Sequence, residues 1–120
     1  MKNIVVQKYG GTSVGTTDKI MRVADRILAL QAQGKKMVVI VSAMGDSTDD
    51  LIKLAKAIDP NPAGREYDAL ISTGEAVSAS LMAIAIKAKG QDAISLSGRQ
   101  AGVFTEDNHS KARILDVKPD

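Results

Sequence analysis

Residues 8–15 have the composition and spacing of a phosphate-binding turn. They read K-Y-G-G-T-S-V-G, one residue after the apolar residues 4–6 and just before a helical pattern that begins near Thr17. A strand that turns through glycines into a helix brings bare backbone N–H groups and the positive helix end to one spot, which favours an anion. The segment is not a Walker A loop, because Thr16 stands where that motif has its lysine. On its residue types alone, it could equally be a plain tight turn with Lys8 as a solvated strand end.

Two further segments place hydroxyls and a carboxylate beside glycines where helices are expected to begin. Residues 39–45 lead from an apolar strand to Ser47 and Thr48, and in open α/β sheets ligands bind at the carboxyl ends of strands. Glu75 follows a glycine at the mouth of an apolar helix, where the helix macrodipole stabilises a carboxylate. Structural explanations remain open for both segments, because Ser47 can act as an N-cap with Asp50 three residues on, and Glu75 can be a favourable first-turn charge.

Strands and helices that alternate along the chain must position these segments. Apolar runs predict strands at residues 3–9, 37–41 and 93–96, and amphipathic patterns predict helices at 17–33, 47–58 and 63–89. The alternation indicates an α/β fold with a mainly parallel sheet. We expect strand 37–41 to be buried on both faces, and helix 63–89 to be packed deep with an interruption at 72–74. Turns or a hairpin should follow Ser97, with a further strand at 113–117.

Length and composition limit the domain count and the kinds of partner. With 120 residues, 44% of them apolar, the chain can bury one core. The net charge of +2 is spread along the chain and aromatic residues make up only 2%, so neither nucleic acid nor a membrane is an expected partner. The absence of cysteine permits a reducing compartment, and we expect a cytoplasmic protein. No metal site is predicted, because His109 is the sole histidine.

The string at residues 8–15 closely resembles the K-[FY]-G-G-T-S-V signature of the aspartate kinases, within the amino-acid kinase superfamily. Residues 39–51 are similar to the family's V-V-S-A-M-G-x-[ST]-T-[DN]-x-L pattern, and residues 72–75 match its [ST]-x-G-E motif. Residues 97–105 look like its [ST]-G-x-Q-A-G-[IV]-x-T stretch, with Arg99 at the first variable position. These four motifs stand in the family's order and span nearly the whole chain.

The resemblance implies a three-layer αβα fold with helices on both faces of the sheet, and phosphoryl transfer from MgATP to the β-carboxylate of L-aspartate. This reaction begins the pathway to lysine, threonine and methionine. By resemblance, Lys8 is the catalytic residue and neutralises charge on the transferring phosphoryl group. The nucleotide-binding set would be Lys8, Tyr9, Gly10, Gly11, Thr12 and Ser13. The aspartate-binding set would be Ser42, Thr48 and Glu75, with Glu75 as a buried anchor for the α-ammonium group.

The family's kinase domain is much longer than this chain, and its second half carries a G-R-G-G-S-D-T segment and the adenine pocket. We therefore expect residues 1–120 to be the amino-terminal, substrate-binding part of the kinase domain, without a regulatory domain and inactive in isolation. The complete protein is expected to be a homo-oligomer. Two alternatives stay open: a non-catalytic α/β module that binds an anion or amino acid, and another amino-acid kinase, such as one acting on glutamate or carbamate.

Overall fold

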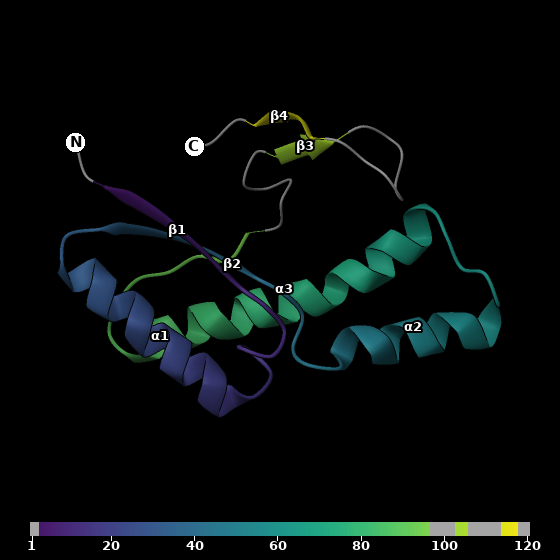
Figure 1. The fold of residues 1–120 in the computed structure, drawn as a ribbon, viewed down its shortest axis with the longest axis horizontal. Coiled ribbons are helices and arrows are strands. Elements are labelled where there is room, and N and C mark those ends of the chain that lie inside the picture. The colour runs from purple at the N-terminus through teal and green to yellow at the C-terminus, as the bar shows by residue number, and fades with distance from the viewer. Residues whose placement is uncertain (1–2, 97–102, 106–113, 118–120) are drawn as a thin grey trace.

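The computed structural model describes residues 3–96, 103–105 and 114–117. Strands and helices alternate through most of this range (Figure 1). Those of the predicted elements that form have bounds within a few residues of the predicted ones. In chain order the elements are β1 (Ile4–Tyr9), α1 (Thr17–Ala32), β2 (Lys36–Val41), α2 (Ser47–Ile58), α3 (Arg65–Ala88), β3 (Val103–Thr105) and β4 (Ile114–Val117).

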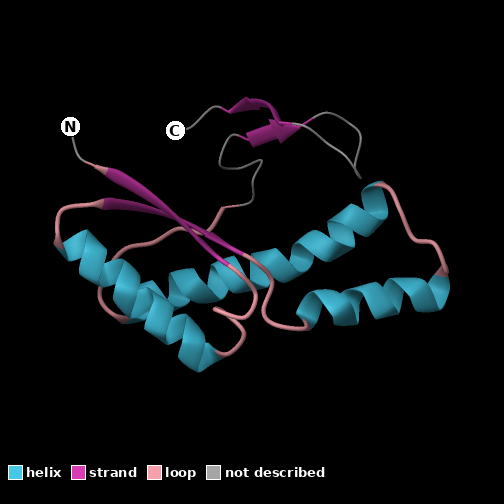
Figure 2. Cartoon of the chain, in the orientation of Figure 1, coloured by secondary structure: helices cyan, strands magenta, loops and turns pink. Residues whose placement is uncertain are grey.

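The parallel pairing of β1 with β2 confirms the predicted α/β class. The register runs from Ile4 opposite Lys36 to Tyr9 opposite Val41, and α1 forms the connection between the two strands (Figure 2). A separate antiparallel pair of β3 and β4 confirms the hairpin expected after Ser97. Because β1 and β2 run in the same direction, the loops that follow them leave the sheet at the same end.

Helices α1 and α3 build the core by packing on one face of the β1–β2 pair. Ion pairing between Lys89 Nζ and Asp25 Oδ1, 2.6 Å apart, joins the end of α3 to α1. Thr16 caps α1, because its side chain accepts a hydrogen bond from the backbone N–H of Lys19. The buried cluster consists of Tyr9, Val14, Ile20, Val23, Ala24, Ile27, Met82, Ala85 and Ile86.

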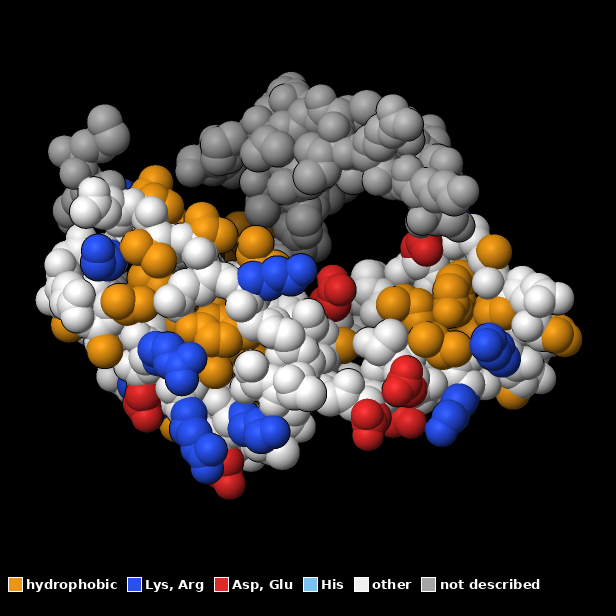
Figure 3. All heavy atoms as spheres, in the orientation of Figure 1, with side chains coloured by type: hydrophobic (Ala, Val, Ile, Leu, Met, Phe, Trp, Pro, Cys, Tyr) orange, Lys and Arg blue, Asp and Glu red, His pale blue; other side chains and the backbone are white. Residues whose placement is uncertain are grey.

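The opposite face of the β1–β2 pair is open among the described residues. Exposure alternates along both strands, and Ile4, Val6, Val38 and Ile40 are 49–65% exposed. Figure 3 shows apolar side chains gathered over these strands and also over the α2–α3 pair. The expectation that strand 37–41 is buried on both faces is therefore wrong for the described part of the chain, because its helices cover only one face.

Helix α3 is continuous, so the predicted interruption at residues 72–74 is wrong. The hydroxyls of Ser72 and Thr73 donate to the carbonyl oxygens of Ala69 and Leu70, at 2.9 and 2.6 Å. These bonds within the helix satisfy the polar side chains without breaking the backbone ladder. Deep packing is also wrong for much of the helix, because Val77 is 52% exposed.

By length and composition, α3 could cross a membrane, with a mean hydropathy of 1.6 over its most apolar window. A core helix of a soluble protein meets the same criterion. In this fold Met82, Ala85 and Ile86 of α3 lie in the buried cluster with α1. The apolar character of α3 is therefore at least partly explained by its packing.

Residues 93–96 do not form the predicted strand. Ala93 packs against the core, whereas Ile94 is 79% exposed and Leu96 is 48% exposed. A strand requires a hydrogen-bonded neighbour, and no described segment pairs with these residues. Their apolar pattern indicates a strand but cannot supply the partner strand.

Candidate functional site

The loops that follow β1 and β2 lie against each other at the carboxyl end of the two strands. The backbone N–H of Gly45 donates to the carbonyl oxygen of Gly11 at 2.9 Å, and the N–H of Ser42 donates to that of Tyr9 at 3.0 Å. Residues 8–15 and the segment from residue 39 to Thr48, both singled out from the sequence alone, are thus neighbours in space. Their position is the one at which open α/β sheets bind ligands.

Gly11 is required by the closeness of these two loops. A Cβ atom added at Gly11 would lie 2.8 Å from the carbonyl oxygen of Ala43, a separation that forces something to shift. Neither Gly10 nor Gly11 has a positive φ, so the conformational freedom of glycine does not explain this pair. Gly10 has no atom within 4 Å of the corresponding position. The two glycines therefore differ: one allows backbone contact, and the other borders open space.

The segment that contains Gly74 and Glu75 also lies beside these loops, because Gly74 of α3 packs against Ala43. A Cβ atom at Gly74 would lie 3.0 Å from Ala43 Cβ and 3.6 Å from Leu51 Cδ1 of α2. Glycine inside a helix is less favourable than alanine by about 1 kcal/mol, so its presence calls for a packing reason. The close approach of α3 to the loop after β2 supplies that reason.

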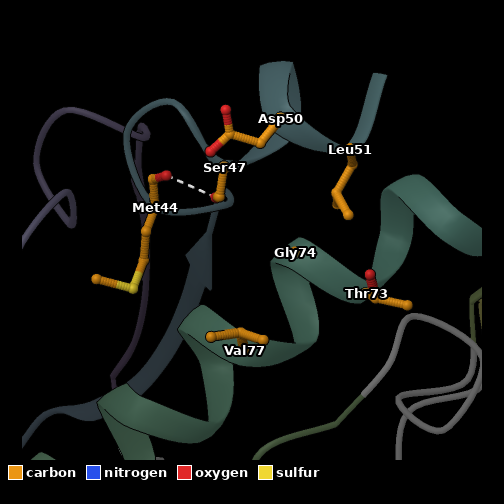
Figure 4. Close-up of a pocket in the computed structure, with 7 residues that line it drawn as sticks. All are labelled: Met44, Ser47, Asp50, Leu51, Thr73, Gly74 and Val77. Atoms are coloured by element: carbon orange, nitrogen blue, oxygen red, sulfur yellow. Dashed lines mark hydrogen bonds between the residues drawn. The ribbon is translucent and has the colours of Figure 1, made fainter. Parts of the chain in front are cut away.

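A pocket of about 270 Å³ lies between the start of α2 and the middle of α3 (Figure 4). The hydroxyl of Ser47 donates to the carbonyl oxygen of Met44 at 2.6 Å, at the side of this pocket. Asp50 is the only charged residue among the described residues that line it. The lining residues are Met44, Ser47, Asp50, Leu51, Thr73, Gly74 and Val77.

The predicted nucleotide-binding residues lie at the end of β1 and in the turn that follows it. Lys8 is exposed on the face of β1 that points away from the helices, and Gly10, Thr12 and Ser13 are exposed in the turn. Tyr9 differs from the rest of the set, because its side chain is 8% exposed and its hydroxyl donates to Gln7 Oε1 at 2.6 Å. The Tyr9 side chain thus forms part of the core.

The predicted aspartate-binding residues lie around the pocket rather than in its lining. Ser42 and Thr48 are half-buried, and Thr48 follows the lining residue Ser47 directly. Glu75 follows the lining residue Gly74, but it is exposed and lies in the middle of α3, which begins at Arg65. Its interpretation as a buried carboxylate at a helix start is wrong in this structure, because the helix continues through residues 72–74.

Ser47 is not the N-cap of α2. Asp46 occupies that position without a side-chain capping bond, and Ser47 is the first helical residue. Its hydroxyl is directed to the Met44 carbonyl instead. This bond closes the turn between the loop after β2 and the helix.

Sequence reasoning did not single out Met44, Leu51, Thr73 or Val77 as site residues. Leu51 belongs to the apolar stripe of α2, and Val77 to the apolar run of α3, which are ordinary packing patterns. The pocket arises only where the two helices diverge next to Gly74. No signal local to either helix identifies it.

The structure describes only some of the residues on which the fourth motif and the metal prediction depend. Of residues 97–105, only 103–105 are described, in β3, and His109 and Arg99 lie outside the described residues. Among the residues that the structure does describe, no group of three or more His, Cys, Asp or Glu side chains could hold a metal ion.

Comparison with known proteins finds a matching family and several similar sequences and structures. The amino acid kinase family matches residues 3–120. The chain is 52% identical to aspartokinase 2 of Bacillus subtilis over 114 residues and to the aspartokinase of Mycobacterium bovis over 116 residues, covering 95% and 97% of the chain. It spans only 28% of the length of these curated relatives. The crystal structure of aspartate kinase from Synechocystis superposes with a TM-score of 0.78 at 53% identity, over 83% of this chain and 17% of that one.

The contact between the two loops predicts different effects of alanine at the adjacent glycines. Gly11→Ala should lower the free energy of unfolding by about 1–3 kcal/mol, because the new methyl group meets the Ala43 carbonyl. Gly10→Ala is the matched control and should change it by less than about 0.5 kcal/mol, since it enters open space. Urea unfolding of the chain, followed by circular dichroism, measures both. Equal effects would mean that the loops are not in contact.

Proposed function

Because the chain belongs to the amino acid kinase family, we propose that it is the amino-terminal, substrate-binding part of the kinase domain of an aspartate kinase. The proposed enzyme transfers the γ-phosphoryl group of ATP to the β-carboxylate of L-aspartate, giving 4-phospho-L-aspartate for the synthesis of lysine, threonine and methionine. The observation that carries the proposal is the hydrogen bond between Gly45 N–H and Gly11 oxygen, at 2.9 Å. It sets the phosphate-type turn beside the segment that contains Ser42 and Thr48.

Lys8 and the turn after it are assigned to the phosphoryl group. The side chain of Lys8 is exposed at the carboxyl end of β1, and the turn that follows is exposed at Gly10, Thr12 and Ser13. A fixed cation and backbone donors aimed at developing negative charge lower the barrier without reorganisation during the reaction. In this proposal Lys8 neutralises the transferring group, and Gly10 and Gly11 donate backbone N–H groups to phosphate oxygens.

The residues present fit the phosphate end of ATP better than they fit a metal ion. The exposed turn suits an anion, whereas the described residues contain no carboxylate cluster for Mg²⁺. In this proposal Mg²⁺ enters with the nucleotide, because in kinases the ion usually binds through substrate phosphates and one or two carboxylates. When bound, Mg²⁺ would neutralise charge on the β- and γ-phosphates.

Thr48, Ser42 and Glu75 are assigned to L-aspartate. Glu75 offers a carboxylate to the α-ammonium group, and the two hydroxyl residues lie where the loop after β2 enters α2. An exposed Glu75 needs a charged partner less than a buried one does, so its contribution depends on how far the bound substrate covers it. We also propose that the complete enzyme is a cytoplasmic homo-oligomer that acts on neither nucleic acid nor membranes.

Turnover requires a complete enzyme, and a chimera provides one. In it, this chain replaces the matching segment of aspartokinase 2 from Bacillus subtilis, to which it is 52% identical. Aspartate-dependent phosphoryl transfer by the chimera, trapped with hydroxylamine, is the direct test of the proposed function. A folded chimera without this activity would contradict it.

Lys8→Ala in the chimera should reduce kcat by about 100-fold or more, because a charge aimed at the transition state is lost. The KM for aspartate should remain within a few-fold of the original value. Lys36→Ala is the matched control, since Lys36 is also exposed but lies at the opposite end of the β1–β2 pair. A rise in KM with unchanged kcat would show that Lys8 binds substrate and does not act on the transition state.

Glu75→Gln should raise the KM for aspartate and leave kcat much less affected, because the substitution removes a negative charge but keeps the shape of the side chain. Glu66→Gln serves as the control at the start of the same helix, where Glu66 lies 3.5 Å from Arg65. Steady-state kinetics at saturating ATP measures both variants. An unchanged KM in Glu75→Gln would leave this carboxylate as a surface charge.

The 120-residue chain alone should form no hydroxamate from aspartate and ATP. The chain spans 28% of the length of its curated relatives, so in this proposal the adenine-binding part of the site comes from elsewhere in the complete enzyme. The same assay with the chimera is the positive control. Turnover by the chain alone that disappears in Lys8→Ala would show that it holds a complete active site.

A further inference from the structure

Ala43 lies where three parts of the candidate site meet: the turn after β1, the loop after β2 and the part of α3 around Gly74. It is 5% exposed and comes directly after Ser42, in the loop that follows β2. Its carbonyl oxygen faces Gly11, where an added Cβ would lie 2.8 Å away, and its Cβ faces Gly74, where the corresponding distance is 3.0 Å. We call this three-residue contact of Gly11, Ala43 and Gly74 the Ala43 junction.

We propose that the Ala43 junction is a positioning device that sets the spacing between α2 and α3, and with it the spacing between Thr48 and Glu75. Ala43 and Gly74 are positioning residues in this proposal and do not themselves touch the substrate. The proposal rests on the proposed function, because it gives these two helices the amino-acid pocket of an aspartate kinase. Figure 4 shows Gly74 on the turn of α3 that approaches the loop and α2.

The junction has no spare room on the side of Ala43. Carbon atoms in favourable contact lie about 3.5–4.0 Å apart, so a methyl group 3.0 Å from Ala43 Cβ requires one neighbour to move. Little room is left for Ala43 to move toward the loop after β1, because its carbonyl oxygen occupies the space that a Cβ at Gly11 would need. The hydrogen bond from Gly45 to Gly11 holds the two loops together on that side.

Helix α3 cannot retreat as a whole either. Met82, Ala85 and Ile86, farther along the helix, lie in the core, and the ion pair of Lys89 with Asp25 fastens its end to α1. A methyl group at Gly74 would therefore tilt the amino-terminal half of α3 away from the loop. Glu75 is the next residue and would move with it, whereas Thr48 on α2 would not.

The test adds a methyl group on one side of the contact and, in a double variant, removes the methyl group on the other side. Gly74→Ala adds the methyl group, and Ala43→Gly in the same chain removes the one that it would meet. In the chimera, Gly74→Ala should raise the KM for aspartate by about tenfold, because the displaced Glu75 carboxylate would hold the α-ammonium group of the substrate less well. The Gly74→Ala/Ala43→Gly double variant should recover most of that loss, and kcat should change by less than about threefold in both.

Thermal unfolding of the 120-residue chain tests the contact without reference to activity. Alanine is the better helix former, so Gly74→Ala should raise the melting temperature if nothing opposes the new methyl group. The Ala43 junction predicts a fall instead, and a recovery in the double variant. A rise in the single variant would overturn the contact, and with it the proposal.

The two measurements separate the possible failures. Recovery of the melting temperature without any change in the KM for aspartate would overturn the positioning role and leave a purely structural contact. A chimera with the original sequence that has no aspartate-dependent activity would overturn the proposed function and the pocket role together. The melting temperatures would still decide whether the contact exists.

Discussion

The parallel pairing of β1 with β2 is the constraint on which the rest of this structure depends. Because both strands point the same way, the loop after β1 and the loop after β2 leave the sheet at one end. The hydrogen bond between Gly45 and Gly11 then joins them. An antiparallel pairing of the same two strands would place the two segments at opposite ends of the sheet, and no common site could form.

The position of α3 follows from its two unequal halves. Its carboxyl-terminal half is anchored in the core with α1, where Met82 and Ile86 are buried. Its amino-terminal half is covered less, and Gly74 is the residue that allows it to approach the loop after β2. The helix is thus held in its carboxyl-terminal half by apolar burial and near its middle by the close approach of Gly74 to Ala43. This arrangement brings the segment that contains Gly74 and Glu75 to the loops after β1 and β2.

The open face of β1 and β2 bears on how the described residues relate to a complete kinase. Apolar side chains that are about half exposed on neighbouring strands, such as Val38 and Ile40, are unusual for a parallel sheet, whose strands are generally covered on both faces. Lys8 lies on this same face, at the end nearest the phosphate-type turn. In the proposed enzyme, a part that covers this face would therefore also lie beside Lys8 and help to complete the site around it.

The sequence by itself determined the type and approximate bounds of most elements in the described part of the chain. Apolar periodicity defines β1, α1 and β2 within a few residues, because this signal acts between residues close in the chain. On residue types alone, the motif at residues 8–15 fitted either a phosphate-binding turn or a plain tight turn, and the resemblance to the aspartate kinases favoured the first. Local signals also failed: residues 72–74 suggested a helix break, but α3 continues through them. The hydroxyls of Ser72 and Thr73 are satisfied by carbonyl oxygens of the same helix.

Only the tertiary structure decided which residues the segments bring together. The need for Gly11 and Gly74 comes from a loop about 30 positions away from each in the sequence, through contacts with Ala43 that no local pattern records. Glu75 lies within a helix and not at its start because α3 already begins at Arg65, and residues 93–96 lack the neighbouring strand that their composition calls for. Local propensity fixes the type of an element, whereas burial, close approach and strand pairing depend on residues far away in the chain.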